Sequence, residues 1–161
     1  MGMKVLESLK DVGATYEVID CDPSFADTAE FCSHYGYSPD ESANAILLEG
    51  KAESPVYALC VVLATTRINV NKVARKRLGT RKASFASAEI TKELTGMEIG
   101  GVTPVGLPVD LPIWIDSLVM ETRKVIIGAG SRSAKIYLSP DNLLRFPNTH
   151  IVDGLSMPIV N

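Results

Sequence analysis

The sequence has little of what disulfide frameworks, zinc sites and nucleophilic triads require. It holds only three cysteines, Cys21, Cys32 and Cys60, in an odd number and without CxxC spacing, so neither a disulfide framework nor a zinc site is expected. It holds two histidines, His34 and His150, and no acidic residue lies at a revealing spacing from either. A GxSxG motif is also absent. We therefore expect no triad, metal or cofactor, and the cysteine usage favours a reducing cytoplasm.

Long hydrophobic runs are missing too. No apolar run approaches the ~20 residues that a membrane-spanning helix needs, and residues 1–13 show no signal-peptide pattern. Hydrophobic residues make up 46% and charged residues 22%, as in ordinary globular proteins, so disorder is not expected. A chain of 161 residues predicts a single domain, which we place over residues 1–161.

Acidic residues are missing from the segment 54–88, although the net charge of the chain is −3. The segment holds these seven basic residues: Arg67, Lys72, Arg75, Lys76, Arg77, Arg81 and Lys82. Such sorting predicts one electropositive face on an acidic body. A charged helix face is usually only solvated. Here, however, no acidic neighbour can form i,i+4 pairs, so charge alone leaves phosphate binding and solvation about equally open.

The hydrophobic pattern predicts an α/β fold. Helices are expected at 3–12, 28–35, 69–78 (or from 71), 88–94 and 139–146. Strands are expected at 15–20, 44–50, 56–64, 82–87, 112–116, 124–130, 134–139 and 150–154. Because the strands cluster and do not strictly alternate with helices, we expect a mixed sheet, curled toward a barrel, with helices packed outside.

One loop is unusually rich in glycine. Residues 95–108, TGMEIGGVTPVGLP, hold four glycines, two prolines and a single charged residue, Glu98. Such a loop can simply shape a tight chain crossing, or it can point backbone N–H groups at a ligand. In the second interpretation, Gly100 and Gly101 contact a carbonyl oxygen or an oxyanion, and we expect a positive φ at Gly101 with open space for a ligand beside it.

A second glycine-containing segment, VIIGAGSRSA at 125–134, approaches the GxGxxG fingerprint. That fingerprint requires a following helix N-terminus to meet a pyrophosphate. The segment that follows here, AKIYLS, is typical of a strand. We therefore predict a turn between two strands, whose Gly130–Ser131 backbone can line a pocket.

Several of these segments, taken in order, resemble the YbaK/prolyl-tRNA synthetase-associated domain family. Its second half is similar to LTGMEIGGVTPVGLP, IWIDSLV and KVIIGAGSRSAKIYLSPDNLL, and its first half to TAEFCSHYGYSPDESANAILLEG and TTRINVNKVARKRLGTRKASFAS. The resemblance extends from about Val18 to Val152. It implies a mixed β-barrel-like sheet flanked by helices. It also implies hydrolysis of the ester between a wrong amino acid and tRNA, by a positioned water or groups of the substrate.

The resemblance also implies roles for individual residues. The loop from Gly100 to Pro104 would form the floor of an aminoacyl pocket. The expected substrate-binding residues are Thr103, Pro104, Asp116, Gly130 and Ser131. The basic segment, which holds no acidic residue, supplies the expected contacts to the tRNA backbone: Arg67, Lys72, Arg75 and Lys76.

The chain departs from the family at one position. Deacylases of the family generally carry a lysine at the start of the first central strand, where this chain has Asn44, whose amide donates hydrogen bonds without charge. We place Asn44 beside Gly100 and Gly101 as the catalytic set. The leading hypothesis is a freestanding aminoacyl-tRNA deacylase acting on mischarged tRNA. The alternatives are a non-catalytic binder of tRNA or an aminoacyl ligand, and a hydrolase or binder of small acyl compounds.

Overall fold

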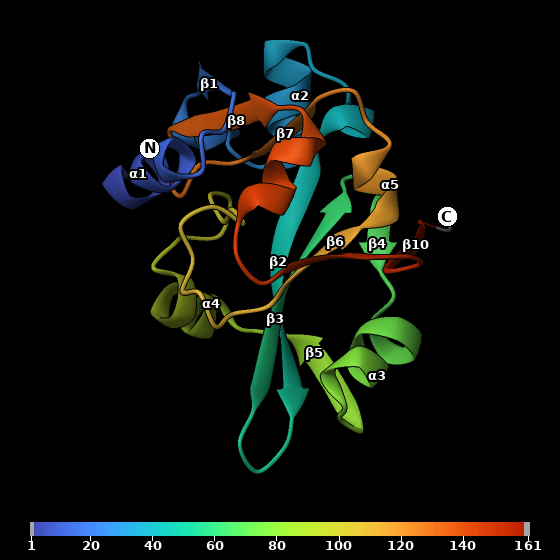
Figure 1. Ribbon diagram of the computed structural model, residues 1–161. Coiled ribbons are helices and arrows are strands. Elements are labelled where there is room, and N and C mark those ends of the chain that lie inside the picture. The colour runs from blue at the N-terminus through green and yellow to red at the C-terminus, as the bar shows by residue number, and fades with distance from the viewer. Residues whose placement is uncertain (1, 160–161) are drawn as a thin grey trace.

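The computed structural model describes residues 2–159 as three small sheets with helices around them (Figure 1). The α-helices are α1 (Met3–Asp11), α2 (Thr28–Tyr35), α3 (Arg75–Leu78), α4 (Ala88–Thr95) and α5 (Ser117–Met120). Short 3-10 helices span Pro23–Phe25, Pro39–Glu41 and Pro140–Arg145, and a π-helical turn spans Val70–Ala74. Among the described residues, no helix is long and apolar enough to cross a membrane.

The largest sheet has five strands in the order β5-β2-β3-β6-β9. Their bounds are β2 Ala43–Lys51, β3 Val56–Leu63, β5 Lys82–Phe85, β6 Ile113–Asp116 and β9 Thr149–Val152. Pairs β5-β2 and β2-β3 are antiparallel, whereas β3-β6 and β6-β9 are parallel. The sheet is therefore mixed, as predicted, and it is open, with β5 and β9 at its edges.

Two smaller sheets complete the fold. One has the order β1-β8-β7, with β1 Glu17–Asp20, β7 Val125–Gly128 and β8 Ala134–Leu138. The other pairs β4 (Thr66–Ile68) with β10 (Ser156–Pro158). An isolated parallel bridge between Ser42 and Ile126 connects the three-stranded sheet to the start of β2. This bridge brings β7 and β8 next to the residues where β2 begins.

The central strands of the five-stranded sheet are buried on both faces, and they are accordingly almost continuously apolar. Leu47, Val61 and Ile115 belong to a core on one face, and Cys60 and Trp114 to a core on the other. Burial raises the pKa of the Cys60 thiol to about 12, as expected for a core cysteine. β2 therefore contributes side chains to both cores.

Most helices and strands confirm the sequence-based prediction, and those that differ from it are only a few residues long. The α2 helix begins after Asp27 and ends at Gly36, whose φ of 78° closes it in the left-handed conformation. The expected helix at 69–78 starts as a π-helical turn, with the Asn69 side chain accepting from the backbone of Lys72. Five short elements were not predicted, namely β4, α5, β10 and the 3-10 helices Pro23–Phe25 and Pro39–Glu41.

Candidate functional site

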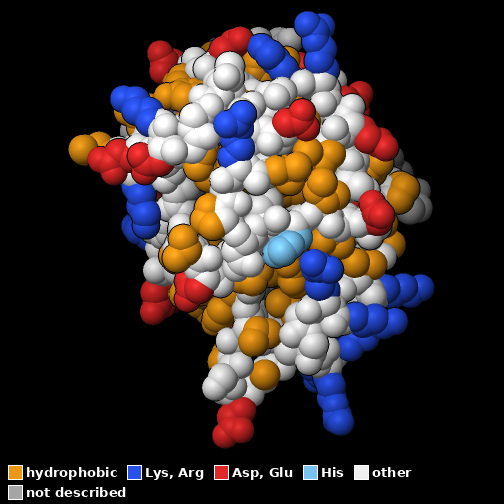
Figure 2. Space-filling view, in the orientation of Figure 1, with side chains coloured by type: hydrophobic (Ala, Val, Ile, Leu, Met, Phe, Trp, Pro, Cys, Tyr) orange, Lys and Arg blue, Asp and Glu red, His pale blue; other side chains and the backbone are white. Residues whose placement is uncertain are grey.

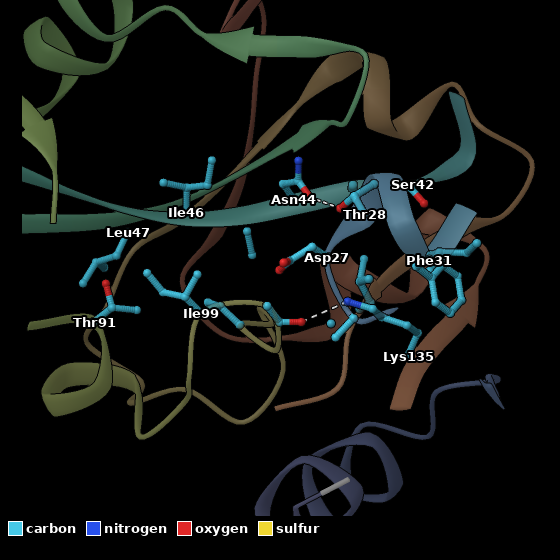
Figure 3. A pocket seen from close by; sticks show the side chains of 18 of the residues that line it. Asp27, Thr28, Phe31, Ser42, Asn44, Ile46, Leu47, Thr91, Ile99 and Lys135 are labelled. Atoms are coloured by element: carbon cyan, nitrogen blue, oxygen red, sulfur yellow. Dashed lines mark hydrogen bonds between the residues drawn. The ribbon is translucent and has the colours of Figure 1, made fainter. Parts of the chain in front are cut away.

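A cavity of about 430 Å³ lies between β2, α2, the glycine loop and the β7–β8 pair. Figure 3 shows its polar end, where Asp27, Thr28, Asn44 and Lys135 lie. Toward the other end its walls are mostly apolar, from Ile46, Leu47, Ile99, Phe85 and Ala86, with the hydroxyl-bearing Thr91 among them. The cavity thus combines an apolar chamber with a small group of converging polar atoms, which is typical of a small-molecule site.

Asn44 lies at the start of β2 and faces the N-terminal turn of α2 (Figure 3). Its Oδ1 accepts a hydrogen bond of 2.7 Å from the Thr28 hydroxyl. That bond orients the amide, so the Nδ2 group has no acceptor among the residues 2–159 and is free to donate to a ligand. Of the predicted catalytic set, Asn44 and Gly100 both line the cavity.

The glycine loop is held tightly against the β7–β8 turn. The Gly101 N–H donates to the Glu98 carbonyl at 2.9 Å, and the Gly101 carbonyl accepts from the Gly130 N–H at 2.7 Å. Both the N–H and the carbonyl of Gly101 are therefore hydrogen-bonded to other backbone groups of the protein. The positive φ of 95° is at Gly100 and not at Gly101, which corrects our expectation.

The space beside Gly101 is also not open for a ligand. A Cβ at Gly101 would lie 2.7 Å from the backbone carbonyl of Ser131, and one at Gly128 would lie 2.2 Å from the Val102 carbonyl. Two glycines, one on each segment, thus let two backbones touch. The Gly130–Ser131 turn, which connects two strands as predicted, supports the loop from behind, and neither residue is among those that line the cavity.

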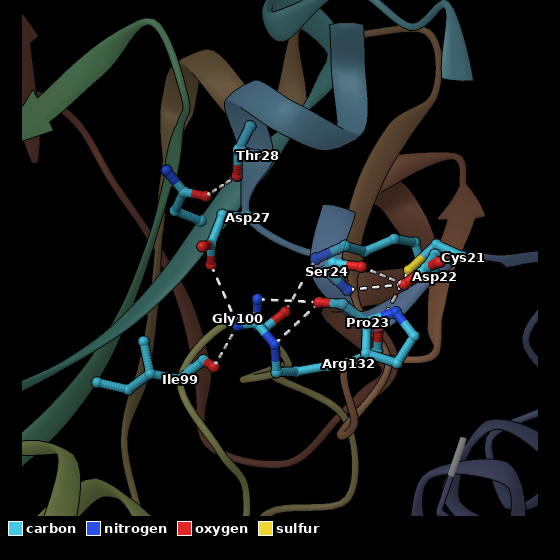
Figure 4. Close-up of polar contacts among 11 residues, drawn as sticks. Cys21, Asp22, Pro23, Ser24, Asp27, Thr28, Ile99, Gly100 and Arg132 are labelled. Carbon is cyan, nitrogen blue, oxygen red and sulfur yellow. Dashed lines mark hydrogen bonds and ion pairs between the residues drawn. The ribbon is translucent and has the colours of Figure 1, made fainter. Parts of the chain in front are cut away.

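Arg132 ties three distant segments together at the edge of the cavity (Figure 4). Its Nη1 donates to the Asp27 carboxylate at 3.2 Å and to the Ile99 carbonyl at 3.0 Å. Its Nε and Nη2 both donate to the Pro23 carbonyl, at 3.2 and 3.1 Å. The guanidinium therefore fixes the glycine loop, the start of α2 and the preceding turn relative to one another.

Lys135 brings a cation into the polar end of the cavity. It lies on β8, its residue is only 7% exposed, and its ammonium donates to the Gly100 carbonyl at 3.0 Å. The ammonium also lies 5.8 Å from the centre of the Phe31 ring. Burial lowers the pKa of Lys135 below its usual value. The sequence analysis did not select this residue.

None of the five predicted substrate-binding residues is among those that line the cavity. Thr103 and Pro104 are buried within the glycine loop, and the Thr103 hydroxyl has no hydrogen-bond partner among the described residues. Asp116 lies at the end of β6 and is 1% exposed, where its carboxylate accepts a hydrogen bond from Ser156. These residues support the loop or the strand end, and the cavity walls come from other segments.

The predicted basic surface lies over α3 and β5, where Lys and Arg side chains gather in Figure 2. Arg67, Lys72 and Lys76 are exposed. Arg75 is partly buried, and its guanidinium donates to the backbone carbonyls of Asn71 and Thr80 at 2.9 and 3.0 Å. Arg75 therefore holds the end of this helix in place, and the other three have free side chains toward solvent.

Metal ligands and nucleophile–base pairs do not converge at this cavity. Within residues 2–159, no group of three His, Cys, Asp or Glu side chains could hold a metal ion. Both histidines are exposed, and His34 stacks on Phe25 with ring centroids 4.0 Å apart. The three cysteines are free and buried. The polar groups that do converge are hydrogen-bond donors, one ammonium and the Asp27 carboxylate.

Comparison with known proteins identifies the family of the chain. The profile of the aminoacyl-tRNA editing domain matches residues 22–146. YwhH of Bacillus subtilis (strain 168) is 30% identical over 130 residues, covering 81% of this chain and 80% of that protein. The "Putative Cys-tRNA(Pro)/Cys-tRNA(Cys) deacylase EbsC" of Enterococcus faecalis (strain ATCC 700802 / V583) is 26% identical over 99 residues, covering 62% of this chain and 58% of that protein.

A solved structure shows the same fold. The crystal structure of a "putative trans-editing enzyme for prolyl tRNA synthetase" superposes with a TM-score of 0.79 at 23% identity, covering 95% of this chain and 97% of that one. The fold is that of an editing-type α/β domain. The chain belongs to the aminoacyl-tRNA editing domain family.

Proposed function

We propose that the protein is a freestanding aminoacyl-tRNA deacylase, which hydrolyses the ester of a mischarged tRNA in the cytoplasm. The observation that carries this proposal is the cavity in which the glycine loop faces Asn44 in a member of the editing family. Asn44 Nδ2 and the Gly100 N–H are both free of acceptors among the described residues. They are suited to bind the acyl carbonyl, while a water molecule attacks the acyl carbon.

The shape of the cavity suits an aminoacyl ester. Its apolar chamber, lined by Ile46, Leu47 and Ile99, would hold an apolar portion of the ligand. Buried apolar contacts of this kind discriminate by size, and polar groups at the other end fix the orientation of the reacting group. Thr103, Pro104, Gly130 and Ser131 act in this proposal by holding the loop, and Asp116 by stabilising the end of β6.

The basic surface offers a path for the tRNA backbone to this cavity. Lys82 begins β5, and Phe85, at the other end of that strand, lines the cavity while remaining 56% exposed. Lys72 and Lys76 project from the neighbouring helical segment. A phosphate backbone bound along these residues would place the acylated end of the tRNA near the cavity mouth.

The test is a deacylation assay with a panel of tRNAs, each carrying a different amino acid, cognate or mischarged. We expect hydrolysis of one or a few mischarged species and protection of the cognate ones. Binding of aminoacyl-tRNA without turnover of any species would contradict the proposal. That result would favour the alternative of a non-catalytic binder, for which Asn44 in place of a lysine is the specific observation.

We predict that the double substitution Lys72→Ala/Lys76→Ala weakens tRNA binding to a similar degree for every tRNA species. Each lost phosphate contact should also reduce the slope of log affinity against log salt concentration by about 0.7–0.9. Fluorescence anisotropy with labelled tRNA at several salt concentrations measures both effects. Arg75 is left in place because it hydrogen-bonds the backbone carbonyls of Asn71 and Thr80, before and after its own helix.

The matched control for this pair is Lys4→Ala/Lys10→Ala, which removes two exposed lysines from α1 on another side of the protein. The control should leave the affinity and the salt slope unchanged. Equal losses in both double variants would mean that tRNA binding depends on total charge only. Unchanged binding in Lys72→Ala/Lys76→Ala would identify the basic surface as merely solvated.

A further inference from the structure

Lys135 is a buried cation without a buried anion beside it. Among the described residues its ammonium forms no salt bridge, and its one hydrogen bond goes to the Gly100 carbonyl at 3.0 Å. The other side of the ammonium faces the Phe31 ring. Removing a cation from water is costly unless an anion or several acceptors compensate for the lost hydration. An ammonium has three N–H donors, and the protein itself supplies an oxygen to only one of them.

The one carboxylate among the cavity-lining residues, that of Asp27, is already paired with Arg132. Asp27 lines the same cavity, but its Oδ1 accepts from Arg132, and the Asp27 side chain is 62% exposed. Arg132 thus neutralises the carboxylate that could otherwise pair with Lys135. The arrangement leaves the positive charge of Lys135 at the polar end of the cavity, which Ser42 and Asn44 also line.

The backbone donors of the glycine loop cannot supply this charge. The Gly101 N–H is bonded to Glu98, and the Gly101 carbonyl to Gly130, so only the Gly100 N–H remains available on these two residues within the described chain. A neutral N–H and the Asn44 amide offer dipoles but no net charge. Hydrogen bonds from an ionised donor are roughly twice as strong as those between neutral groups.

We propose that Lys135 is a catalytic residue whose ammonium stabilises the oxyanion formed on the acyl carbonyl of the substrate. This inference rests on the proposed deacylase function, and it identifies Lys135 as the source of the positive charge at the reacting carbonyl. In the step, a water oxygen bonds to the acyl carbon, and the C=O π electrons move to the carbonyl oxygen, which Lys135 and Asn44 then bind. When the C=O bond reforms, the bond to the ribose oxygen breaks, and that oxygen takes a proton originating from the attacking water. The products are the amino acid and tRNA with a free ribose hydroxyl, and Lys135 stays protonated throughout.

The test compares binding of a charged and a neutral analogue of alanyl-adenosine. The charged probe is the 1-aminoethylphosphonate ester of adenosine, whose anionic oxygens mimic the oxyanion, and the neutral probe is the alanyl amide of 3'-amino-3'-deoxyadenosine. Alanine is chosen because its methyl group is small enough for the cavity. Isothermal titration calorimetry should show that the native protein binds the phosphonate at least about 100-fold more tightly than the amide.

The decisive variant is Lys135→Gln, because glutamine keeps an N–H donor for the Gly100 carbonyl but removes the charge. It should reduce phosphonate affinity by about 100-fold and amide affinity by no more than about 3-fold, and lower kcat far more than it raises KM. Lys124→Met is the matched control, since that lysine lies over the Tyr137 ring and is not part of the cavity lining. It should change neither affinity.

Three results would overturn the assignment: no preference of the native protein for the phosphonate, an intact preference in Lys135→Gln, or an equal loss of both probes in a folded Lys135→Gln. The last would mean that Lys135 only braces the glycine loop. Should Lys135→Gln fail to fold, Lys135→Met, which suits an apolar site, is measured by the same criteria. A native protein that prefers the phosphonate but hydrolyses no aminoacyl-tRNA would contradict the deacylase function and leave the role of Lys135 as an anion-binding group intact.

Discussion

Gly101→Val is expected to abolish deacylation, with kcat/KM falling by at least about 1,000-fold, while the protein retains its secondary structure. The reason is steric, because a Cβ at this position would lie within 2.7–2.8 Å of the Ser131 backbone. Backbone cannot move aside as a flexible side chain can, so the loop must shift away from the β7–β8 turn. Its neighbour Gly100, which lines the cavity and accepts from Lys135, moves with it. Displacements of about 1 Å at a reacting centre can already cost about 100-fold in rate.

Two measurements separate this effect from unfolding. Circular dichroism should show an unchanged spectrum with a lowered melting temperature, since the bond from the Gly130 N–H to the Gly101 carbonyl is lost. The matched control is Gly96→Asn, in the same loop. Gly96 ends α4 with a φ of 74°, a conformation that asparagine tolerates, and no atom within 4 Å would meet its Cβ. The control should keep most of its activity, and full turnover by Gly101→Val would place the reaction outside this cavity.

The fold could be predicted largely because local chemistry and burial point the same way along most of the chain. Gly36 and Gly96 end α2 and α4 as expected, and the apolar runs of β2 and β3 pair as antiparallel neighbours. The elements that were missed, β4, α5, β10 and the 3-10 helices at 23–25 and 39–41, are three or four residues long. Such short elements have no hydrophobic period and are formed by tertiary pairing, as in the bonding of β4 to β10.

The candidate site could be predicted only in part, because a cavity is made by segments far apart in the sequence. Asn44 and Gly100 were found because the glycine loop has a distinctive composition and the resemblance drew attention to position 44. Arg132 and Lys135 carry no comparable signal. Lys135 is one polar residue in the strand AKIYL, where alternation alone predicts a solvent-facing side chain. Only the packing of α2 over β7 and β8 turns that face inward.

Asn44→Ala is expected to lower kcat by two to three orders of magnitude with little change in stability. The amide is oriented by the Thr28 hydroxyl at 2.7 Å, so its Nδ2 can bind the carbonyl oxygen without first being ordered. Loss of one such preorganised donor typically costs about 100- to 1,000-fold in kcat. The measurement is single-turnover deacylation of the mischarged tRNA that the native protein hydrolyses. A purely local role of Asn44 at the start of β2 predicts unchanged rates instead.

Thr28→Val is the matched control, because it removes the hydroxyl that orients Asn44 and leaves the amide in place. It should slow the reaction by about 10-fold, less than Asn44→Ala, since the donor is disordered but not lost. If Thr28→Val and Asn44→Ala were equally inactive, the α2 terminus would be the critical element. In that case, Asn44 would serve only to hold it.

Asn44→Lys then tests whether the chain lost a needed charge at this position or carries that charge elsewhere. If the charge was lost, the native protein is a binder, and Asn44→Lys should restore deacylation. If Lys135 already supplies it, a second ammonium in the same low-dielectric cavity is repelled, and Asn44→Lys should be slower than the native protein. The double variant Asn44→Lys/Lys135→Gln separates the two effects, because it keeps one ammonium but moves it from β8 to β2. We expect the double variant to be faster than Lys135→Gln alone, since the new ammonium enters the same polar end of the cavity from the opposite wall. A double variant as slow as Lys135→Gln would mean that the position of the charge, fixed on β8 against the Gly100 carbonyl, matters as much as its presence.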